Sequence, residues 1–195
     1  AILDATARLS GQPGCLMVHG GSGLLAASLG IGSAALDCTP MVVLSATQER
    51  KAMENGWWQT LDVQKPIADF VKFQTRVERP DQAVAAVRDA LHASVSGKPG
   101  VAQIDIPIDV STDELGTDDV PAPVRMATPH IRSFPDPGLV EKAADLLARA
   151  QRPVLLIGGG ANYSGAGDAL MRLAERLGAP VVNSPTSRGV LPESN

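Results

Sequence analysis

Short apolar runs alternate with helix-like stretches along the first half of this chain. Three of these runs, Cys15–Val18, Met41–Ser45 and Val101–Ile106, predict strands that are covered on both faces. Between the first two lies Ser22–Leu36, which is apolar on nearly every side and is therefore predicted to be a helix buried on nearly every face. A strand, helix, strand order of this kind indicates an α/β fold with a parallel sheet.

Further elements complete the first half of the chain. Residues 1–10 are predicted to form a helix, and Phe70–Val77 alternates polar and apolar residues as a half-exposed strand does. Pro80 and Asp81 open a predicted helix with one apolar stripe, made of Val84, Val87, Leu91 and Val95. The stretch from residue 47 to residue 65 is polar and irregular, and its pattern sets no element boundaries.

The composition changes in the middle of the chain, where prolines and acidic residues crowd into residues 107–137. We interpret this segment as an interdomain linker of extended, polyproline-like character. The predicted organisation is a first α/β domain over residues 1–112, a Pro-rich linker over residues 113–137, and the start of a second, Rossmann-like α/β domain over residues 138–195. That second part has a helix, strand, helix, strand pattern at Gly138–Ala150, Pro153–Ile157, Gly165–Leu177 and Val181–Asn183.

Composition and charge narrow the class of protein. The 195 residues carry a net charge of −4 and are 44% hydrophobic, which is typical of a soluble globular protein. No strongly basic patch is present, so nucleic acid is not expected as a partner. The longest weakly polar run, Leu24 to Leu36, is too short and too rich in glycine and serine to cross a bilayer, so no membrane is expected. The two cysteines, Cys38 and Cys15 in a predicted buried strand, favour a reducing compartment, and we expect a cytoplasmic protein.

A histidine and a glycine-rich turn follow the first predicted strand, with the order His19, Gly20, Gly21, Ser22, Gly23. Ligands of open α/β sheets bind at the carboxyl ends of strands, and glycines let the backbone approach a ligand closely. His19 is the sharpest catalytic candidate because imidazole transfers protons near neutral pH. Two alternatives stay open: His19 only hydrogen-bonds a loop carbonyl, and the glycines only form a turn. The turn is not a P-loop, because no Gly-Lys-Ser/Thr follows.

Six segments, in the same order, resemble the thiamine-diphosphate enzymes of the acetolactate synthase and pyruvate decarboxylase type. They cover nearly the whole chain apart from the linker, and each is modest by itself. The segments are DATARLSGQPG (residues 4–14), the strand, turn and helix of residues 14–36, DCTPMVVLSAT (37–47), WWQTLDVQKPIADFVKFQTRV (57–77), SGKPGVAQIDIPIDV (96–110), and RPVLLIGGGANYSGA with RGVLPESN near the end.

The resemblance implies most of a pyrimidine-binding domain followed by the start of a central domain. The parent enzyme would use thiamine diphosphate and Mg²⁺ as a decarboxylase or carboligase of a 2-oxo acid, and would be a homodimer or homotetramer. The family's catalytic glutamate would lie upstream of Asp4, and the diphosphate- and magnesium-binding domain far downstream. Because the chain lacks an initiator Met, we interpret it as a fragment that contributes part of the cofactor site, holds no metal ligand and is inactive alone. The alternative is a non-catalytic nucleotide-binding or association module.

The resemblance also implies roles for individual residues. The segment VHGGSG (residues 18–23) is similar to LHSAAGTGN of the benzoylformate decarboxylase branch, although it is shorter and lacks the asparagine. This implies that His19 shuttles protons and that the small residues of the turn pack near the aminopyrimidine of the cofactor. Gln59 aligns with a glutamine that lines the family's site, and an exposed polar residue is its alternative. Trp57 and Trp58 could line a substrate channel or an oligomer interface.

A second glycine turn, Gly158-Gly159-Gly160, follows a predicted strand and suggests a nucleotide site. The dinucleotide fingerprint fails at its third glycine, where Tyr163 stands, and the next strand ends at Asn183 instead of an acidic residue. A hydride-transfer enzyme is therefore not expected. The resemblance implies FAD or an adenine nucleotide as a possible ligand here, with Arg188 as a possible contact. A plain turn and a solvated arginine are the alternatives.

Overall fold

A computed structural model describes residues 1–115 and 133–192 of the chain. The chain divides into two compact units, residues 1–130 and 131–195, which are treated separately below. Most of the predicted linker lies outside the described residues. No helix in the described ranges is long and apolar enough to cross a membrane.

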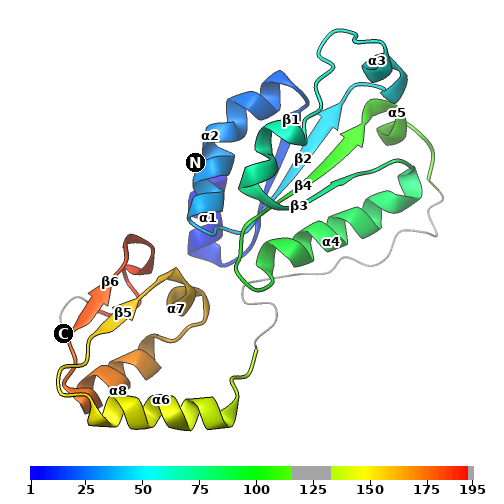
Figure 1. Ribbon diagram of the computed structural model, residues 1–195. Helices are drawn as coiled ribbons and strands as arrows, with labels where there is room; N and C mark the ends of the chain where they lie inside the picture. Colours follow the sequence, from blue (N-terminus) through cyan, green and yellow to red (C-terminus); the bar gives the residue numbers. More distant parts are fainter. Residues whose placement is uncertain (116–132, 193–195) are drawn as a thin grey trace. The chain divides into compact units, whose positions relative to one another are not determined.

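The first unit is built on a four-stranded parallel sheet with the order β1-β2-β4-β3 (Figure 1). The prediction of three neighbouring parallel strands in one sheet is confirmed, and the fourth strand lies at the far edge. The strands are β1 Gly14–His19, β2 Met41–Thr47, β3 Val71–Arg76 and β4 Val101–Pro107.

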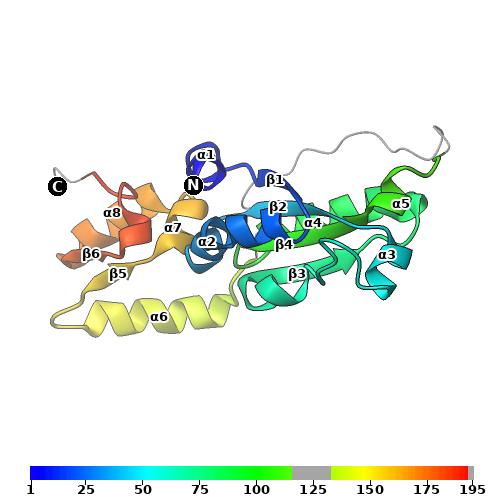
Figure 2. The same ribbon diagram turned by 90° about the horizontal axis from the view of Figure 1, so that it is seen from above.

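Helices cover both faces of this sheet, as Figure 2 shows from above. One face packs against α1 Ile2–Ser10, α2 Ser22–Leu36 and the 3-10 helix η1 Lys65–Phe70, around a core that includes Leu24, Ile31, Val43 and Ile67. The other face packs against α4 Ala83–Val95, which follows the 3-10 turn η2 Pro80–Gln82, around Val42, Ala90, Ala102 and Ile104. Two short helices, α3 Arg50–Glu54 and α5 Ile108–Ser111, lie beyond the carboxyl ends of β2 and β4.

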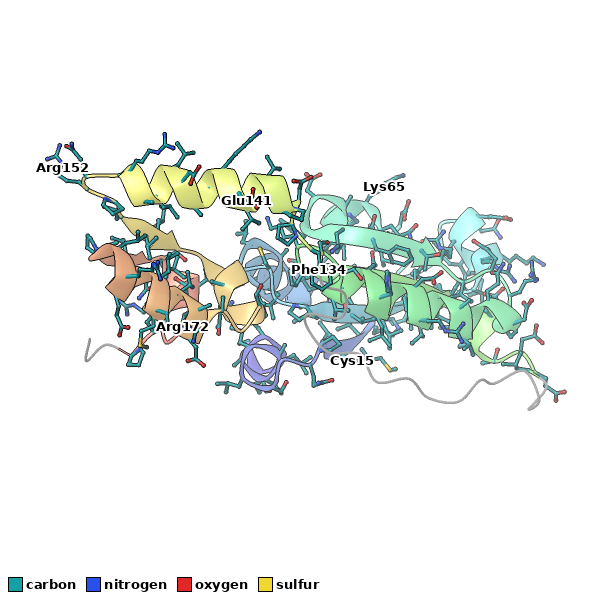
Figure 3. All side chains as sticks on the ribbon, turned by 90° about the horizontal axis from the view of Figure 1, so that it is seen from below. Cys15, Lys65, Phe134, Glu141, Arg152 and Arg172 are labelled. Carbon is teal, nitrogen blue, oxygen red and sulfur yellow. The ribbon has the colours of Figure 1, made fainter. Side chains whose placement is uncertain are left out.

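Two burial predictions were wrong for one reason, the position of each element at the border of the sheet. Helix α2 exposes Leu25, Leu29 and Leu36, with Leu29 85% exposed, instead of being buried on nearly every face. Cys15 is exposed, not buried, because β1 is an edge strand and α4 does not cover the face of β1 on which the Cys15 side chain lies (Figure 3). Both cysteines are free thiols.

Helix α4 contacts the sheet with small residues as well as with part of the predicted valine and leucine stripe, of which Leu91 is half-buried against the core. Its buried positions include Ala86, Ala90 and Ser94, whereas Val87 is exposed. Small residues let the helix axis approach the strands closely, so the alanine face was preferred over the face with the larger side chains. Val95, the last residue of the predicted stripe, is buried as expected.

The second unit holds a separate two-stranded parallel sheet, β5 Leu155–Ile157 with β6 Val181–Asn183, as predicted. Its helices are α6 Pro137–Arg149, α7 Gly159–Tyr163 and α8 Gly167–Leu177, and the 3-10 turn η4 Pro185–Ser187 follows β6. The glycine turn expected at residues 158–160 instead leads straight into α7. Many large apolar side chains of this unit are exposed, among them Leu139, Leu146 and Leu156.

Candidate functional site

The carboxyl ends of the four parallel strands define one edge of the first unit. The register aligns His19 of β1 with Ala46 of β2, Ala46 with Ile106 of β4, and Asp105 of β4 with Arg76 of β3. The glycine turn that follows β1 and the loop between α3 and η1 both lie at this edge. In open parallel sheets this is where ligands bind.

His19 ends strand β1 with an exposed side chain. Its Nδ1 lies 2.9 Å from the carbonyl oxygen of Gly20. A carbonyl only accepts hydrogen bonds, so Nδ1 carries the proton and, in the neutral ring, Nε2 is the basic nitrogen. The contact expected under the alternative, in which His19 only hydrogen-bonds a loop carbonyl, is therefore present. The same contact fixes the tautomer of the ring and leaves Nε2 as the acceptor nitrogen.

Gly20 is a glycine because of the neighbouring strand. A Cβ added here would lie 2.4 Å from the carbonyl oxygen of Ala46 and 3.0 Å from Cα of Thr47. The Gly20 N–H also donates to the Ala46 carbonyl, with an N···O distance of 2.6 Å. Gly20 thus holds the end of β1 tightly against β2, which is a structural role in the turn.

Gly21 lies next to the loop that carries Gln59. It has a positive φ of 64° and caps the start of α2, where no side chain supplies the capping hydrogen bond. A Cβ at Gly21 would lie 3.5 Å from the carbonyl oxygen of Gln59. The fold therefore brings Gln59 beside the glycine turn, although 37 residues separate the two in sequence. Ser22 is exposed at the first position of α2, and a Cβ at Gly23 would meet Cβ of His19 at 3.5 Å.

The loop that carries Gln59 is tightly turned. Gln59 itself has a positive φ of 59°, uncommon for a residue with a side chain. The Trp57 carbonyl accepts hydrogen bonds from both the backbone N–H and the hydroxyl of Thr60. Trp57 and Trp58 project from this turn and are 71% and 75% exposed. The loop therefore presents two exposed aromatic rings next in sequence to Gln59.

Polar side chains of the sheet hydrogen-bond to the next part of this loop, at Val63 and Gln64. Gln103 of β4 is fully buried and donates from Nε2 to the carbonyl of Val63 at 3.3 Å and to the hydroxyl of Ser45 at 3.1 Å. Gln74 of β3 donates from Nε2 to the carbonyl of Gln64 and to Oε1 of Gln103, both at 2.8 Å. These amides supply donors to loop carbonyls that the sheet would otherwise leave unsatisfied.

An ion pair lies next to the two glutamines. Arg76 Nε donates to Oδ2 of Asp105 at 2.6 Å, and Asp105 is fully buried. Arg76 Nη2 also lies 3.6 Å from Oδ1 of Asp62 in the loop. Burial raises the pKa of Asp105 above its ordinary value, because desolvation of the carboxylate outweighs the attraction of Arg76.

Gln74, Arg76, Gln103 and Asp105 were not singled out from the sequence. A usable signal was present, because Gln103 and Asp105 are polar residues at alternate positions of an otherwise apolar strand. Gln74 and Arg76 repeat that spacing in β3. Two strands with matching polar positions indicate a shared polar patch on one face, once their pairing is known.

The residues predicted to bind a nucleotide lie in the second unit. Space is open around Gly158 and Gly160, where an added Cβ would meet nothing within 4 Å, whereas at Gly159 it would lie 3.0 Å from Oγ1 of Thr186. Arg188 is exposed and follows η4, which contacts α7. Within the described ranges, no group of three or more His, Cys, Asp or Glu residues could hold a metal ion.

Comparison with known families gives two matches. The family model described as the thiamine pyrophosphate enzyme N-terminal TPP binding domain matches residues 2–67, and the one described as the thiamine pyrophosphate enzyme central domain matches residues 140–195. The glycine turn and Gln59 lie inside the first match.

Similar proteins agree with these matches. The chain is 31% identical over 194 residues to a probable acetolactate synthase large subunit of Methanocaldococcus jannaschii, 30% identical to 2-hydroxyacyl-CoA lyase 1 of Mus musculus, and 33% identical to a probable 2-ketoarginine decarboxylase of Pseudomonas aeruginosa. These alignments cover 97–98% of this chain and 33–34% of the relatives, so the chain spans about a third of their length. A solved structure from Mycobacterium smegmatis, described as a thiamin diphosphate-dependent enzyme, superimposes with a TM-score of 0.87 at 26% identity, over 100% of this chain and 37% of that one.

Proposed function

This chain belongs to the thiamine pyrophosphate enzymes, and from that premise we propose that the complete gene product decarboxylates a 2-oxo acid or joins its acyl unit to a second carbonyl compound. The names of its relatives support this range of reactions, since they include a synthase, a lyase and a decarboxylase. The alternative of a non-catalytic module is less well supported, because these relatives are named as enzymes.

The observation that carries the proposal is the approach of Gln59 to the glycine turn. An aminopyrimidine is a flat ring with hydrogen-bonding groups along its edge, so it needs small residues on one side and an amide or carbonyl within reach. A side chain at Gly21 would extend toward the carbonyl of Gln59 and fill the space between turn and loop. The support for the proposal is therefore that residues without bulky side chains and the amide-bearing Gln59 meet at the carboxyl edge of the sheet.

The proposed roles of the chain's own residues follow from this geometry. Gly21 and Gly23 would leave room for the ring, and Gln59 would contact its edge. His19, with Nδ1 hydrogen-bonded to the Gly20 carbonyl, would move protons at Nε2. The exposed rings of Trp57 and Trp58 would exclude water from the same edge. Thiamine diphosphate, when bound, supplies the carbanion-stabilising chemistry.

Other parts of the proposal concern the rest of the gene product. Mg²⁺ and the diphosphate would be held outside the described ranges, in which no cluster of metal-binding side chains is present. A homodimer or homotetramer would complete the site. An adenine nucleotide or FAD near Gly158 and Gly160 stays a prediction, as does a cytoplasmic location, which the two free thiols favour.

The test is carbon dioxide release by the purified complete gene product from a panel of 2-oxo acids, with and without thiamine diphosphate and Mg²⁺. We expect turnover of at least one 2-oxo acid that depends on both additions. The 195-residue chain by itself, assayed in parallel, should bind the cofactor weakly and show no turnover. A gene product that binds no thiamine diphosphate, or that binds it and converts no 2-oxo acid, would refute the proposal.

A further inference from the structure

The loop beside the glycine turn changes its mode of anchoring along its length. From Trp57 to Thr60 it is held by its own backbone turn. From Asp62 to Gln64 its contacts instead come from side chains of the sheet: Gln103 reaches the Val63 carbonyl and Gln74 reaches the Gln64 carbonyl. The apolar side chain of Val63 is fully buried at the same place. Side chains of strands β3 and β4 therefore hold this part of the loop by hydrogen bonds, and the core holds it through Val63.

We propose that Gln74, Arg76, Gln103 and Asp105, named here the loop clamp, position Gln59 against the glycine turn by holding the loop that also carries the two tryptophans. These four are positioning residues, because their side chains bond to the loop, to one another and to Ser45 of β2. The inference rests on the proposed function for its meaning, since the loop matters to catalysis only if the cofactor ring binds beside it.

Polar anchoring suits this task better than apolar packing. Apolar contacts are non-directional and allow a loop to slide, whereas a hydrogen bond to one carbonyl fixes one residue at one place. The two glutamines bond to each other as well as to the loop, so each holds the other's amide in the required orientation. Arg76 adds a link to Asp62, with the buried carboxylate of Asp105 holding its guanidinium in place.

Strand β3 offers a matched pair of substitutions. Gln74→Met keeps the side-chain volume similar and removes two donated bonds, to the Gln64 carbonyl and to Gln103. Lys72→Met, two residues earlier on the strand, also removes two donated bonds, to the carbonyls of Ser96 and Lys98 at 2.8 and 2.6 Å. Those carbonyls lie at the amino end of β4, away from the loop. Each variant loses two hydrogen bonds, Gln74→Met on the side of the loop and Lys72→Met at the amino ends of the strands.

The measurement is hydrogen–deuterium exchange of the complete gene product without cofactor, followed in the peptide that covers residues 55–64. Gln74→Met should speed exchange in this peptide about tenfold, while Lys72→Met should leave it unchanged and speed exchange near residues 96–98. In the 195-residue chain both tryptophans lie on this loop, so acrylamide quenching of their fluorescence gives a second readout and should increase in Gln74→Met alone. If Gln74→Met is too unstable to purify, Gln74→Asn shortens the same amide by one methylene and serves instead.

The ligand readout separates the inference from the proposed function. In the complete gene product, Gln74→Met should weaken thiamine diphosphate binding and raise KM more than it lowers kcat, because the loop reaches its bound position less often. Unchanged exchange and quenching in Gln74→Met would overturn the loop clamp while leaving the proposed function intact. Faster loop exchange in a gene product that binds no thiamine diphosphate would refute the proposed function and keep the clamp as a structural device.

Discussion

Replacing Gly20 by alanine should loosen the end of β1 from β2 and destabilise the first unit. The added Cβ would lie 2.4 Å from the Ala46 carbonyl oxygen, whereas carbon and oxygen in close contact stay about 3.3 Å apart. The two backbones must therefore separate by roughly 0.9 Å. The obstacle is backbone on the opposite strand, so no side chain can rotate away to relieve it.

The cost has two parts. Overpacking of this kind costs about 1–3 kcal/mol, and the Gly20 to Ala46 backbone hydrogen bond, worth about 0.5–1.5 kcal/mol, is stretched or lost. The total loss in the free energy of unfolding is about 1.5–4.5 kcal/mol. For a chain of this length, it should lower the melting temperature by roughly 3–18 °C.

Tryptophan fluorescence is the suitable assay, since both tryptophans of the chain lie in the first unit and report its melting alone. Gly23→Ala is the matched control. Its Cβ would meet Cβ of His19 at 3.5 Å, an ordinary contact, and alanine favours a helix over glycine by about 0.5–1 kcal/mol. The control should melt at the wild-type temperature or slightly above it. Equal melting of the two variants would refute the argument that β2 excludes a side chain at Gly20.

Two further predictions concern ionisable side chains. His19→Ala in the complete gene product should slow turnover of a 2-oxo acid by about 10²–10⁴-fold, the usual range for loss of an acid–base group, with little change in thiamine diphosphate affinity. Unchanged single-turnover chemistry with a lower melting temperature would leave His19 as a loop anchor. Asp105 has a pKa raised from 3.8, so the folded state holds its proton more tightly than the unfolded state does. Its contribution to stability should therefore fall as the pH rises from 3.8 through the raised pKa. The other carboxyl groups contribute equally to both proteins, so urea titrations should show that the free energy of unfolding of the wild type, minus that of Asp105→Asn, falls across this window. A parallel pair of pH profiles would contradict this.

The strands and helices of the first unit were largely predictable because their signals are local. Val101–Ile106 is an apolar run and became β4, an interior strand covered on both faces. The same reasoning failed for Cys15, since an apolar run does not say whether its strand lies at the centre or the edge of a sheet. It failed again for α4, where the composition of the helix favoured Val87 and the close approach of the strands favoured Ala86 and Ala90.

The sequence by itself determined that His19 ends a strand and that a glycine turn opens a helix after it, because backbone hydrogen bonding and steric limits act over a few neighbouring residues. Only the tertiary structure decided that Gln59 would lie beside Gly21, and that Gln74 and Gln103 would meet beneath the loop. The contact between Gln74 and Gln103 requires β3 to pair with β4 instead of with β2. Strand order is set by the burial of apolar surface and the satisfaction of polar groups across the whole unit, and no window of sequence contains that information.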